Sequence, residues 1–422
     1  MVCIDLGACI FGVMHPKNLH ISKFTYDLPE EFIPKYPLAE RDSSKLLVYE
    51  NGEITLDVYQ NIDRHIPGDS LLVFNNTKVV EARILFQKPT GGVIEIFCLE
   101  PHTSADISTA MLQKEKVLWR CLVGGASKWK PGQILEKKIE LNGEIIILHA
   151  AIADRLPDCF VIELTWEPIS LTFAEILHAA GLIPLPPYLH RPAEEKDKET
   201  YQTVYAANDG SVAAPTAGLH FTENIFQKLA EKNIETAFLT LHVGAGTFKP
   251  VKSESIGDHV MHAEFFEVNV STLKSLVTNL DKGIVAVGTT SLRTLESLYW
   301  LGFKITLNTS FDDVIFELDQ WYAYEAATQI LPAKTALQNL IKWLEEKQQT
   351  KLIGTTQIMI APGYKFRIVK GIITNFHQSQ STLLLLIAAM VGDDWKRIYE
   401  YAKQNNFRFL SYGDGSLLWA KA

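Results

Sequence analysis

The sequence predicts an α/β domain, built on a mixed sheet covered by helices, with an inserted all-β barrel-like domain. Two observations lead to this organisation. From residue 70 to residue 167, short β-branched and apolar runs follow one another closely, with turn residues between them and no helical period. After residue 168, strand-like runs alternate with helix-length amphipathic segments. We therefore expect residues 70–167 to form the inserted domain, and residues 20–69 together with 168–422 to form the α/β domain.

The composition is that of a globular protein. The 422 residues are 47% hydrophobic and 21% charged, which excludes the disordered, collagen-like and coiled-coil classes. The net charge of −9 argues against a surface that is basic throughout, although a few local Lys and Arg side chains suffice for phosphate contacts. The five Cys residues show no C-x-x-C spacing, so we expect a reducing, cytoplasmic environment rather than a disulfide framework.

Residues 1–19 are interpreted as an N-terminal extension. The stretch from Met1 to Val13 is apolar, but it contains Asp5 and no Lys or Arg precedes it. It is too short to span a bilayer and is a poor signal peptide. No stretch elsewhere approaches 18 uninterrupted apolar residues, so we expect no membrane association. The character of the sequence changes at Met14, where we expect translation to begin.

The inserted domain should contain six or more short strands. Turn pairs such as Asn75-Asn76, Gly91-Gly92 and Asn142-Gly143 separate them. This density of strands is typical of a small barrel or sandwich. Trp119 and Trp129 lie within a basic stretch. Either these rings and the basic side chains stack on or steer nucleic acid, or the stretch is an ordinary solvated face. The expected strands are LLVF (71–74), VVEARILF (79–86), GVIEIFCL (92–99), VLWRCLV (117–123), EIIILHA (144–150) and DCFVIELTW (158–166).

The rest of the chain predicts helices between strands. The helix at 171–180 should end at Gly181, and Thr222 should cap the next helix, with Phe221 and Phe226 placed for a hydrophobic staple. Further helices are expected at 271–280, 291–300 and 383–390, and strands at 234–243, 283–290, 352–360 and 366–376. Within 303–351 we expect a loop followed by an amphipathic helix, whose apolar face is Ala336, Leu337, Leu340, Ile341 and Leu344.

Small and polar residues gather at four places where ligands bind in open α/β sheets, outside the carboxyl ends of strands. The first is SVAAPTAGLHFT (211–222), in which Thr216 and Gly218 belong to a cluster that lets backbone approach a ligand. His220 precedes a helix N-terminus, which suits a carboxylate or a phosphate. The alternative is an ordinary loop with a solvent-facing His.

The second place is LHVGAGTFKPV (241–251), with His242 at its entrance and Gly244 and Gly246 after it. Lys249 occupies the third glycine position of a dinucleotide fingerprint, so the segment is not a Rossmann motif. What remains is either a backbone-exposing ligand loop or a tight turn.

The third place is VGTTSLRTLES (287–297). Thr289 and Thr290 follow a buried strand, and Arg293 lies in the first turn of the next helix. A cation there opposes the helix dipole, so we expect Arg293 to have an anionic partner. That partner is either a ligand carboxylate or Glu296, which is three residues along the helix.

The fourth place is GIITNFHQSQSTLLLL (371–386). Asn375 offers both a donor and an acceptor, which suits a purine edge. His377 is a candidate acid or base near neutral pH, with a structural His as the alternative.

A metal site is not expected. His259, His262 and Glu264 have a loose metal-ligand spacing, but no H-E-x-x-H helix is present. The sequence also lacks a P-loop and a G-x-S-x-G elbow.

Taken together, these segments resemble the S-adenosylmethionine:tRNA ribosyltransferase-isomerases of queuosine biosynthesis, over nearly the whole chain from about His20. The segments that carry the resemblance are YPLAERDSSKLLV (36–48), GDSLLVFNNTKVVEARI (68–84), GLIPLPPYLHR (181–191), YQTVYA (201–206), SVAAPTAGLHFT (211–222), LHVGAGTFKPV (241–251), VGTTSLRTLES (287–297), PGYKFRIVKGIITNFH (362–377) and RFLSYGDGSLL (408–418).

The resemblance implies that the ribosyl part of S-adenosylmethionine is moved onto 7-aminomethyl-7-deazaguanine in tRNA and isomerised. The product is epoxyqueuosine, and adenine and methionine are released. The implied partners are S-adenosylmethionine, as co-substrate, and the anticodon loop of tRNA. The resemblance implies no metal and no further cofactor, and we expect a monomer.

The resemblance also assigns roles to residues. The catalytic candidates are His220, His242, His377 and Arg293, with Arg293 pairing with an anion. The candidates for substrate binding are Thr216, Gly218, Gly244, Gly246, Thr289, Thr290, Asn375 and Asp414, the last for a ribose hydroxyl or for orienting a His. Lys365 and Arg367 are candidates for contact with tRNA phosphates.

The chain departs from the family in two places. After Asn-Phe-His the family reads Leu-Pro-Lys-Ser, whereas this chain has Gln378-Ser379-Gln380-Ser381. Residues 303–351 replace a shorter connection. These departures keep open an alternative function, a paralogue on the same scaffold that binds RNA or a nucleoside with altered or lost catalysis.

Overall fold

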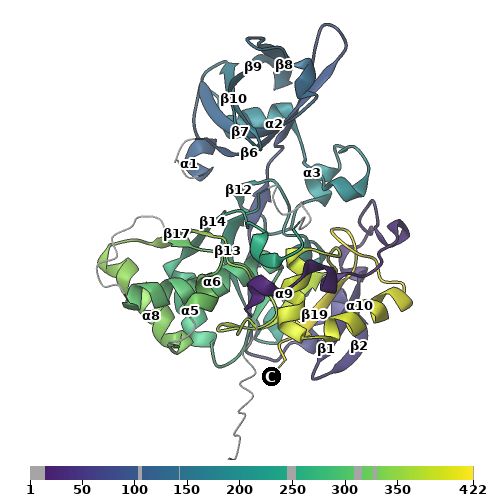
Figure 1. Ribbon diagram of the computed structural model, residues 1–422, viewed down its shortest axis with the longest axis vertical. Helices are drawn as coiled ribbons and strands as arrows, with labels where there is room; N and C mark the ends of the chain where they lie inside the picture. Colours follow the sequence, from purple (N-terminus) through teal and green to yellow (C-terminus); the bar gives the residue numbers. More distant parts are fainter. Residues whose placement is uncertain are drawn as a thin grey trace, which may run out of the picture.

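The protein is described by a computed structural model, which covers residues 15–102, 107–141, 143–244, 253–307, 316–326 and 330–421. Two sheets organise these residues. A ten-stranded mixed sheet forms the lower body in Figure 1, and a curled, seven-stranded antiparallel sheet lies above it. The mixed α/β class that the sequence predicts is therefore confirmed.

The larger sheet has the strand order β16-β17-β14-β13-β3-β15-β18-β19-β1-β2. Its four central strands run parallel, so their carboxyl ends meet at one edge. They are β13 (Glu235–His242), β3 (Leu71–Asn75), β15 (Ile284–Val287) and β18 (Val369–Asn375). Because β19 is antiparallel to β18 and β1 is parallel to β19, both of these strands begin at that same edge. The outer strands are β19 (Gly415–Trp419), β1 (Lys45–Glu50), β2 (Glu53–Val58), β14 (Glu264–Asn269), β17 (Lys351–Thr356) and β16 (Phe316–Leu318).

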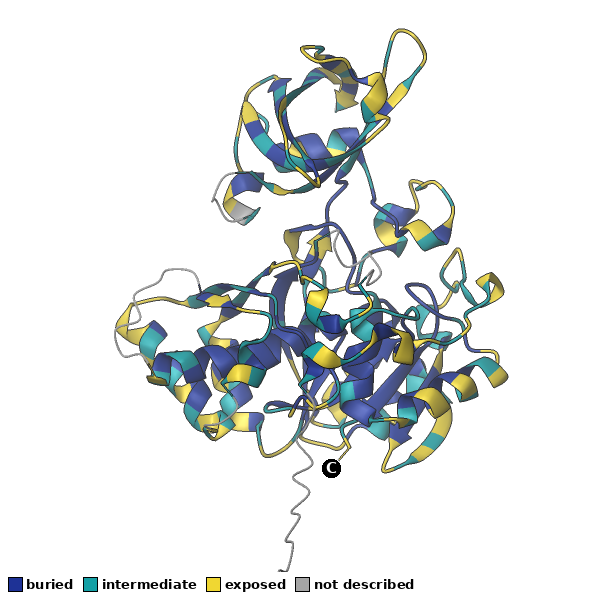
Figure 2. Cartoon of the chain, viewed as in Figure 1, coloured by how far each residue is buried: buried dark blue, intermediate teal, exposed yellow. Residues whose placement is uncertain are grey.

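Helices cover both faces of this sheet. On one face the core joins alternate strand residues to α5, α6, α8, α9 and α10, and on the other to α4. Figure 2 shows the result as a continuous buried band through the lower body. Strands buried on both faces read as uninterrupted apolar runs, as β3 and β15 do. The helices are α4 (Glu223–Glu231), α5 (Val270–Asn279), α6 (Thr289–Leu307), α8 (Ala333–Glu346), α9 (Thr382–Val391) and α10 (Asp394–Gln404), with the shorter α7 (Tyr322–Glu325). Two further short helices are α1 (Ile107–Met111), which packs in the core of the smaller sheet, and α3 (Asp197–Thr200).

The helix signals in the sequence are confirmed. The Thr222 hydroxyl accepts a hydrogen bond from the Ile225 amide at the start of α4, and the rings of Phe221 and Phe226 lie 5.9 Å apart. In α8 all five predicted apolar positions are buried: Ala336, Leu337, Leu340, Ile341 and Leu344.

The smaller sheet has the order β11-β5-β6-β7-β10-β9-β8. Helix α2 (Phe173–Ala180), which a Thr172–Glu175 capping box starts, closes its concave face. Phe173 packs 4.7 Å from the Trp119 ring and 5.9 Å from the Trp166 ring. The strands are β5 (Arg83–Gln87), β6 (Val93–Pro101), β7 (Lys116–Gly124), β8 (Leu135–Leu141), β9 (Glu144–Arg155), β10 (Phe160–Glu167) and β11 (Gly181–Leu182).

The boundaries of this second unit differ from the predicted 70–167. The run at 71–74 is β3, at the centre of the larger sheet. The run at 79–86 breaks after β4 (Thr77–Val79), which pairs with β12 (Asn208–Ser211), and the second unit starts with β5. At the other end, α2 belongs to the core of the smaller sheet. An apolar run carries no information on which sheet it joins, which is why the predicted boundaries differ from the observed ones.

The N-terminal expectation is only partly within the described residues, since 1–14 lie outside them. Residues from His15 onward pack on the body, with Pro16, Ile21 and Phe24 buried and the Ser255 hydroxyl donating to the Lys17 carbonyl at 2.6 Å. Within the described ranges, no helix combines the length and the apolar character that a membrane crossing requires.

Gly302 allows α6 and α8 to pack closely. A Cβ atom at this position would lie 2.2 Å from the Ala336 carbonyl oxygen in α8. Ala normally stabilises a helix interior relative to Gly by about 1 kcal/mol, but overpacking of a close contact typically costs about 1–3 kcal/mol. We expect Gly302→Ala to lower the free energy of unfolding in urea, whereas Leu307→Ala, at an exposed position of α6, stays within about 0.5 kcal/mol of wild type. A more stable Gly302→Ala protein would contradict this packing.

Candidate functional site

A cavity of about 110 Å³, partly open to solvent, lies at the carboxyl ends of the central strands. All four predicted segments meet here, the second of them through Val243 alone. Of the predicted residues, Thr216, Thr289, Thr290, Asn375 and His377 line the cavity.

A chain of hydrogen bonds runs from the cavity wall into the protein. The Thr216 hydroxyl donates to Oδ1 of Asn375 at 2.8 Å, and Nδ2 of Asn375 lies 3.4 Å from Nε2 of His220. Nδ1 of His220 lies 3.3 Å from the Arg41 carbonyl, which only accepts, so Nδ1 carries the proton and Nε2 accepts from Asn375. His220 stacks on Tyr59 at 4.2 Å and lies behind Asn375, outside the cavity lining.

His377 lies in the cavity wall with its ring held at one end. Its Nε2 is 3.0 Å from the Thr374 hydroxyl, and its backbone N–H donates to the Tyr399 hydroxyl at 3.1 Å. Within the described part of the chain, nothing hydrogen-bonds Nδ1 of this ring. Burial lowers the pKa of His377 to about 3, and it lowers the pKa of His220 to about 4. Both rings are therefore uncharged at neutral pH.

Two helices begin at the cavity. Helix α6 starts at Thr289 after Gly288, which has φ 90°, and α9 starts at Thr382 after its cap residue Ser381. The hydroxyl of Ser381 accepts a hydrogen bond from the Leu384 amide. Helix N-termini carry partial positive charge and free N–H groups, so this end of the cavity favours negative charge on a ligand.

Arg293 has a partner that neither sequence alternative named. Its Nη1 donates to the buried carboxylate of Glu264 on β14. Glu296 instead accepts from the amides of residues 367–369 and from the Tyr364 hydroxyl. Arg293 and Gly244 line a second pocket, which adjoins the cavity because Leu383 lines both.

Other predicted residues lie outside both pockets. Nδ1 of buried His242 lies 3.1 Å from the Thr77 hydroxyl. Gly218 makes room for Tyr205, whose hydroxyl would lie 1.7 Å from a Cβ atom at this position. Gly246 falls outside the described residues. Lys365 is exposed and Arg367 half-buried in the loop before β18, about 20 Å from the cavity if each strand residue rises about 3.3 Å.

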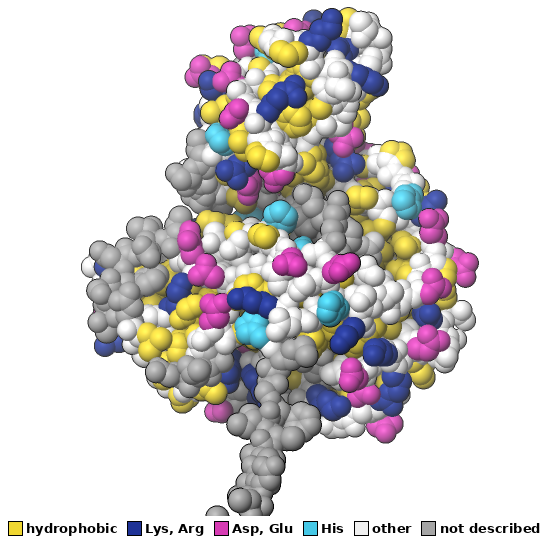
Figure 3. Space-filling view, viewed as in Figure 1, with side chains coloured by type: hydrophobic (Ala, Val, Ile, Leu, Met, Phe, Trp, Pro, Cys, Tyr) yellow, Lys and Arg dark blue, Asp and Glu magenta, His cyan; other side chains and the backbone are white. Residues whose placement is uncertain are grey.

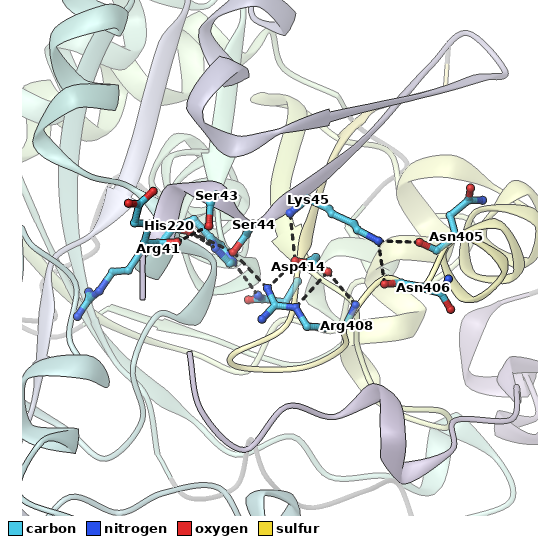
Figure 4. A network of polar contacts seen from close by, with 11 residues as sticks. Arg41, Ser43, Ser44, Lys45, His220, Asn405, Asn406, Arg408 and Asp414 are labelled. Atoms are coloured by element: carbon cyan, nitrogen blue, oxygen red, sulfur yellow. Dashed lines mark hydrogen bonds and ion pairs between the residues drawn. The ribbon is translucent and has the colours of Figure 1, made fainter. Parts of the chain in front are cut away.

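Asp414 belongs to a polar network beside His220 (Figure 4). Its carboxylate accepts from Nη2 and the backbone N–H of Arg408, at 2.6 and 2.8 Å, and from the Lys45 amide at 3.0 Å. This network joins the starts of β1 and β19. Asp414 thus has protein partners. It makes no direct hydrogen bond to His220, but its negative charge partly offsets the lowering of the His220 pKa by burial.

Sequence reasoning missed several residues of the site. Tyr188, Tyr201 and Ser411 line the cavity, and the Tyr188 and Ser411 hydroxyls lie 2.6 Å apart. The segments that contain these three residues carried the family resemblance, and this was the signal that could have identified them. Buried Asn75 was interpreted only as a turn residue. Its side-chain amide nevertheless forms hydrogen bonds with the backbone of Leu241 in β13 and lies 3.4 Å from the Thr290 hydroxyl.

His259, His262 and Glu264 all line the second pocket. Among the described residues, no group of three or more His, Cys, Asp and Glu side chains is arranged to hold a metal ion.

Comparison with known proteins gives three findings. A family model described as "Queuosine biosynthesis protein" matches residues 21–418. A protein of Pelobacter propionicus named S-adenosylmethionine:tRNA ribosyltransferase-isomerase is 36% identical over 406 residues, which cover 94% of this chain and 99% of that protein. A crystal structure of S-adenosylmethionine tRNA ribosyltransferase from Thermotoga maritima aligns with a TM-score of 0.44 at 26% identity, covering 94% of this chain and 99% of that one.

The two buried His rings predict an acid-sensitive fold. Since their folded pKa values lie below the unfolded value of about 6.5, the unfolded chain binds more protons below that pH, and stability falls as the pH drops towards 4. Between pH 7.5 and pH 5, His220 should account for about 2 kcal/mol of this loss. Urea unfolding of His220→Gln should therefore show a shallower pH dependence than wild type, and exposed His20→Gln should show none of this change. Equal slopes for His220→Gln and wild type would contradict a neutral buried His220.

Proposed function

This chain belongs to the queuosine biosynthesis protein family, and from this membership we infer that it is an S-adenosylmethionine:tRNA ribosyltransferase-isomerase. The resemblance predicted from the sequence is thereby confirmed. The enzyme moves the ribosyl part of S-adenosylmethionine onto the aminomethyl group of 7-aminomethyl-7-deazaguanine in tRNA. It rearranges the ribosyl group to the epoxycyclopentanediol of epoxyqueuosine, and it releases adenine and methionine.

The observation that supports this function best is the cavity at the strand ends. It brings together Thr216, Thr289, Asn375 and His377 from segments far apart in the chain. We propose that Thr289, Thr290 and the Asn375–Thr216 pair hydrogen-bond the nucleoside. His220 keeps the Asn375 amide oriented from behind and acts as a positioning residue.

We propose that His377 takes the first proton. The sulfonium makes the neighbouring 5′ C–H acidic, so a neutral base can break that bond and leave the electron pair on carbon. The ring of His377 is neutral and its Nδ1 has no hydrogen bond from the described residues. Because burial disfavours the imidazolium, the proton gained is readily passed on to the departing adenine. One side chain thus serves as base and then as acid.

Contact with tRNA is a separate proposal. The modified base must lie out of any stack, which a single-stranded anticodon loop provides. On the face seen in Figure 3, basic side chains are interspersed with acidic ones over both units. Lys365 and Arg367 lie at the opposite end of β18 from the cavity, so they would reach phosphates away from the reacting base. The Arg367 guanidinium also lies 5.6 Å from the Tyr299 ring, which holds it in place.

A binding-only paralogue is less well supported, because the departure at Gln380 does not reach the cavity. The Gln380 amide donates to the Thr25 hydroxyl at 3.1 Å, and its backbone N–H donates to the Phe24 carbonyl. Gln378 and Ser381 line the cavity, but Gln380 does not.

Removal of the proposed base should abolish most turnover. We expect His377→Ala to lower kcat by about 10²–10⁴-fold, the usual contribution of a positioned general base. His220→Ala should lower kcat by about tenfold or more through the Asn375 contact. The assay is adenine release from S-adenosylmethionine with precursor-containing tRNA, with circular dichroism to verify folding. His178→Ala, at an exposed site on the smaller unit, is the control. Near-normal turnover in His377→Ala would remove this residue from the mechanism.

The departure at Gln380 should be catalytically silent. We expect Gln380→Lys to change kcat/KM by less than about threefold, because this side chain faces Thr25 rather than the cavity. Gln378→Lys is the matched control, since it places the same charge in the cavity wall and should impair turnover. A large gain of activity in Gln380→Lys would instead favour the altered paralogue.

A further inference from the structure

The second pocket continues the main cavity along α6 and α9. Leu383 lines both spaces, and Thr382, the first residue of α9, lines the second. Thr290 of the cavity and Arg293 of the pocket are one turn apart on the same side of α6, about 4.5 Å along its axis. The two spaces therefore adjoin at Leu383, and a ligand that passes this side chain would occupy both.

The base of this pocket holds an incompletely bonded cation. Arg293 is only 7% exposed, and its Nη1 donates to Glu264. Its Nε and Nη2 are buried without a hydrogen-bond partner. These two N–H groups lie on the same edge of the planar guanidinium, which is the edge that binds a carboxylate through two parallel hydrogen bonds. Buried charged donors are rarely left unpaired, so this edge points to a ligand.

The charges around Arg293 select the class of ligand. Glu264 already pairs with the guanidinium, so the carboxylate of a ligand would place a second negative charge beside it in a buried site. An α-amino acid brings its own ammonium group, which offsets the charge of its carboxylate. His259, His262 and Thr382 also line the pocket, and the apolar part of its wall, with Met261, Met359 and Leu386, suits a methylene and thioether chain.

Building on the proposed function, we propose that this pocket binds the amino-acid end of S-adenosylmethionine, with its carboxylate on the Nε/Nη2 edge of Arg293. Glu264 is then a positioning residue that holds Nη1 and turns the other edge to the ligand. The adenosine part stays in the main cavity, and the sulfonium lies near Leu383, where the two spaces join.

The test compares S-adenosylmethionine with decarboxylated S-adenosylmethionine, which lacks only the carboxylate. Wild type, assayed by adenine release with precursor-containing tRNA, should prefer S-adenosylmethionine in kcat/KM by about 100-fold or more. In Arg293→Gln this preference should fall to within a few-fold of one, because the loss falls on the carboxylate-bearing substrate alone. Arg397→Gln, at an exposed ion pair, is the matched control and should keep the wild-type preference.

The possible results of this experiment distinguish a failure of this inference from a failure of the proposed function. If wild type uses both substrates equally well, or if Arg293→Gln slows both by the same factor, the inference is overturned while the proposed function stands. If wild type releases no adenine from S-adenosylmethionine, the proposed function fails. Should Arg293→Gln not fold, Arg293→Lys keeps the charge but loses the bidentate edge, and it should still reduce the preference.

Discussion

One fully buried side chain, Asn75, ties the site together. It lies at the end of β3, where its amide donates to the Leu241 carbonyl at 2.9 Å and accepts from the Leu241 amide at 3.0 Å. The same amide lies 3.4 Å from the Thr290 hydroxyl at the start of α6. The ends of two parallel strands and a helix N-terminus are thereby held in one arrangement. The cavity depends on that arrangement, because its walls are the residues that follow these strands.

Electrostatics divides the site into two parts. The main cavity has the uncharged His377 ring and two helix N-termini, with the uncharged His220 ring behind Asn375, whereas full charges are paired just beyond it, as in Arg293–Glu264 and Arg408–Asp414. Positive helix ends stabilise a carboxylate and the negative charge that develops on a leaving purine. Uncharged rings can accept a proton without first losing one. Under the proposed mechanism, the acid–base groups lie where charge would change during the reaction, and the paired charges lie where it would not.

The sequence predicted the helices and strands better than the contacts that their residues make with distant parts of the chain. Helices such as α8 carry a strong period, and all four segments contribute to one cavity because parallel strands end at one edge. His242 was chosen for the same reason, but it packs on Thr77, whereas its neighbour Val243 lines the cavity, as alternation along a strand requires. The partner of Arg293 lies on β14, which local spacing cannot identify. Asn75 has the pattern of a turn residue, and the apolar run at 71–74 fits a strand of either sheet, so only the pairing between distant strands shows where they belong.

Of the two departures from the family pattern, the one at 378–381 reaches the cavity wall through Gln378, whereas the one at 303–351 lies away from it. In the sheet order, β16 is separated from β18 by five strands, or about 29 Å at about 4.8 Å per strand. The described residues of 303–351 build this far edge, and α8 packs on α5 and α6 rather than on the cavity. Buried apolar residues of α8 add stability at the edge, and the residues at the strand ends are left as the family pattern has them. Asn375, His377 and Thr216 lie in segments that carry the family resemblance, and a scaffold that changes mainly at its edge favours the proposed enzyme over the binding-only paralogue.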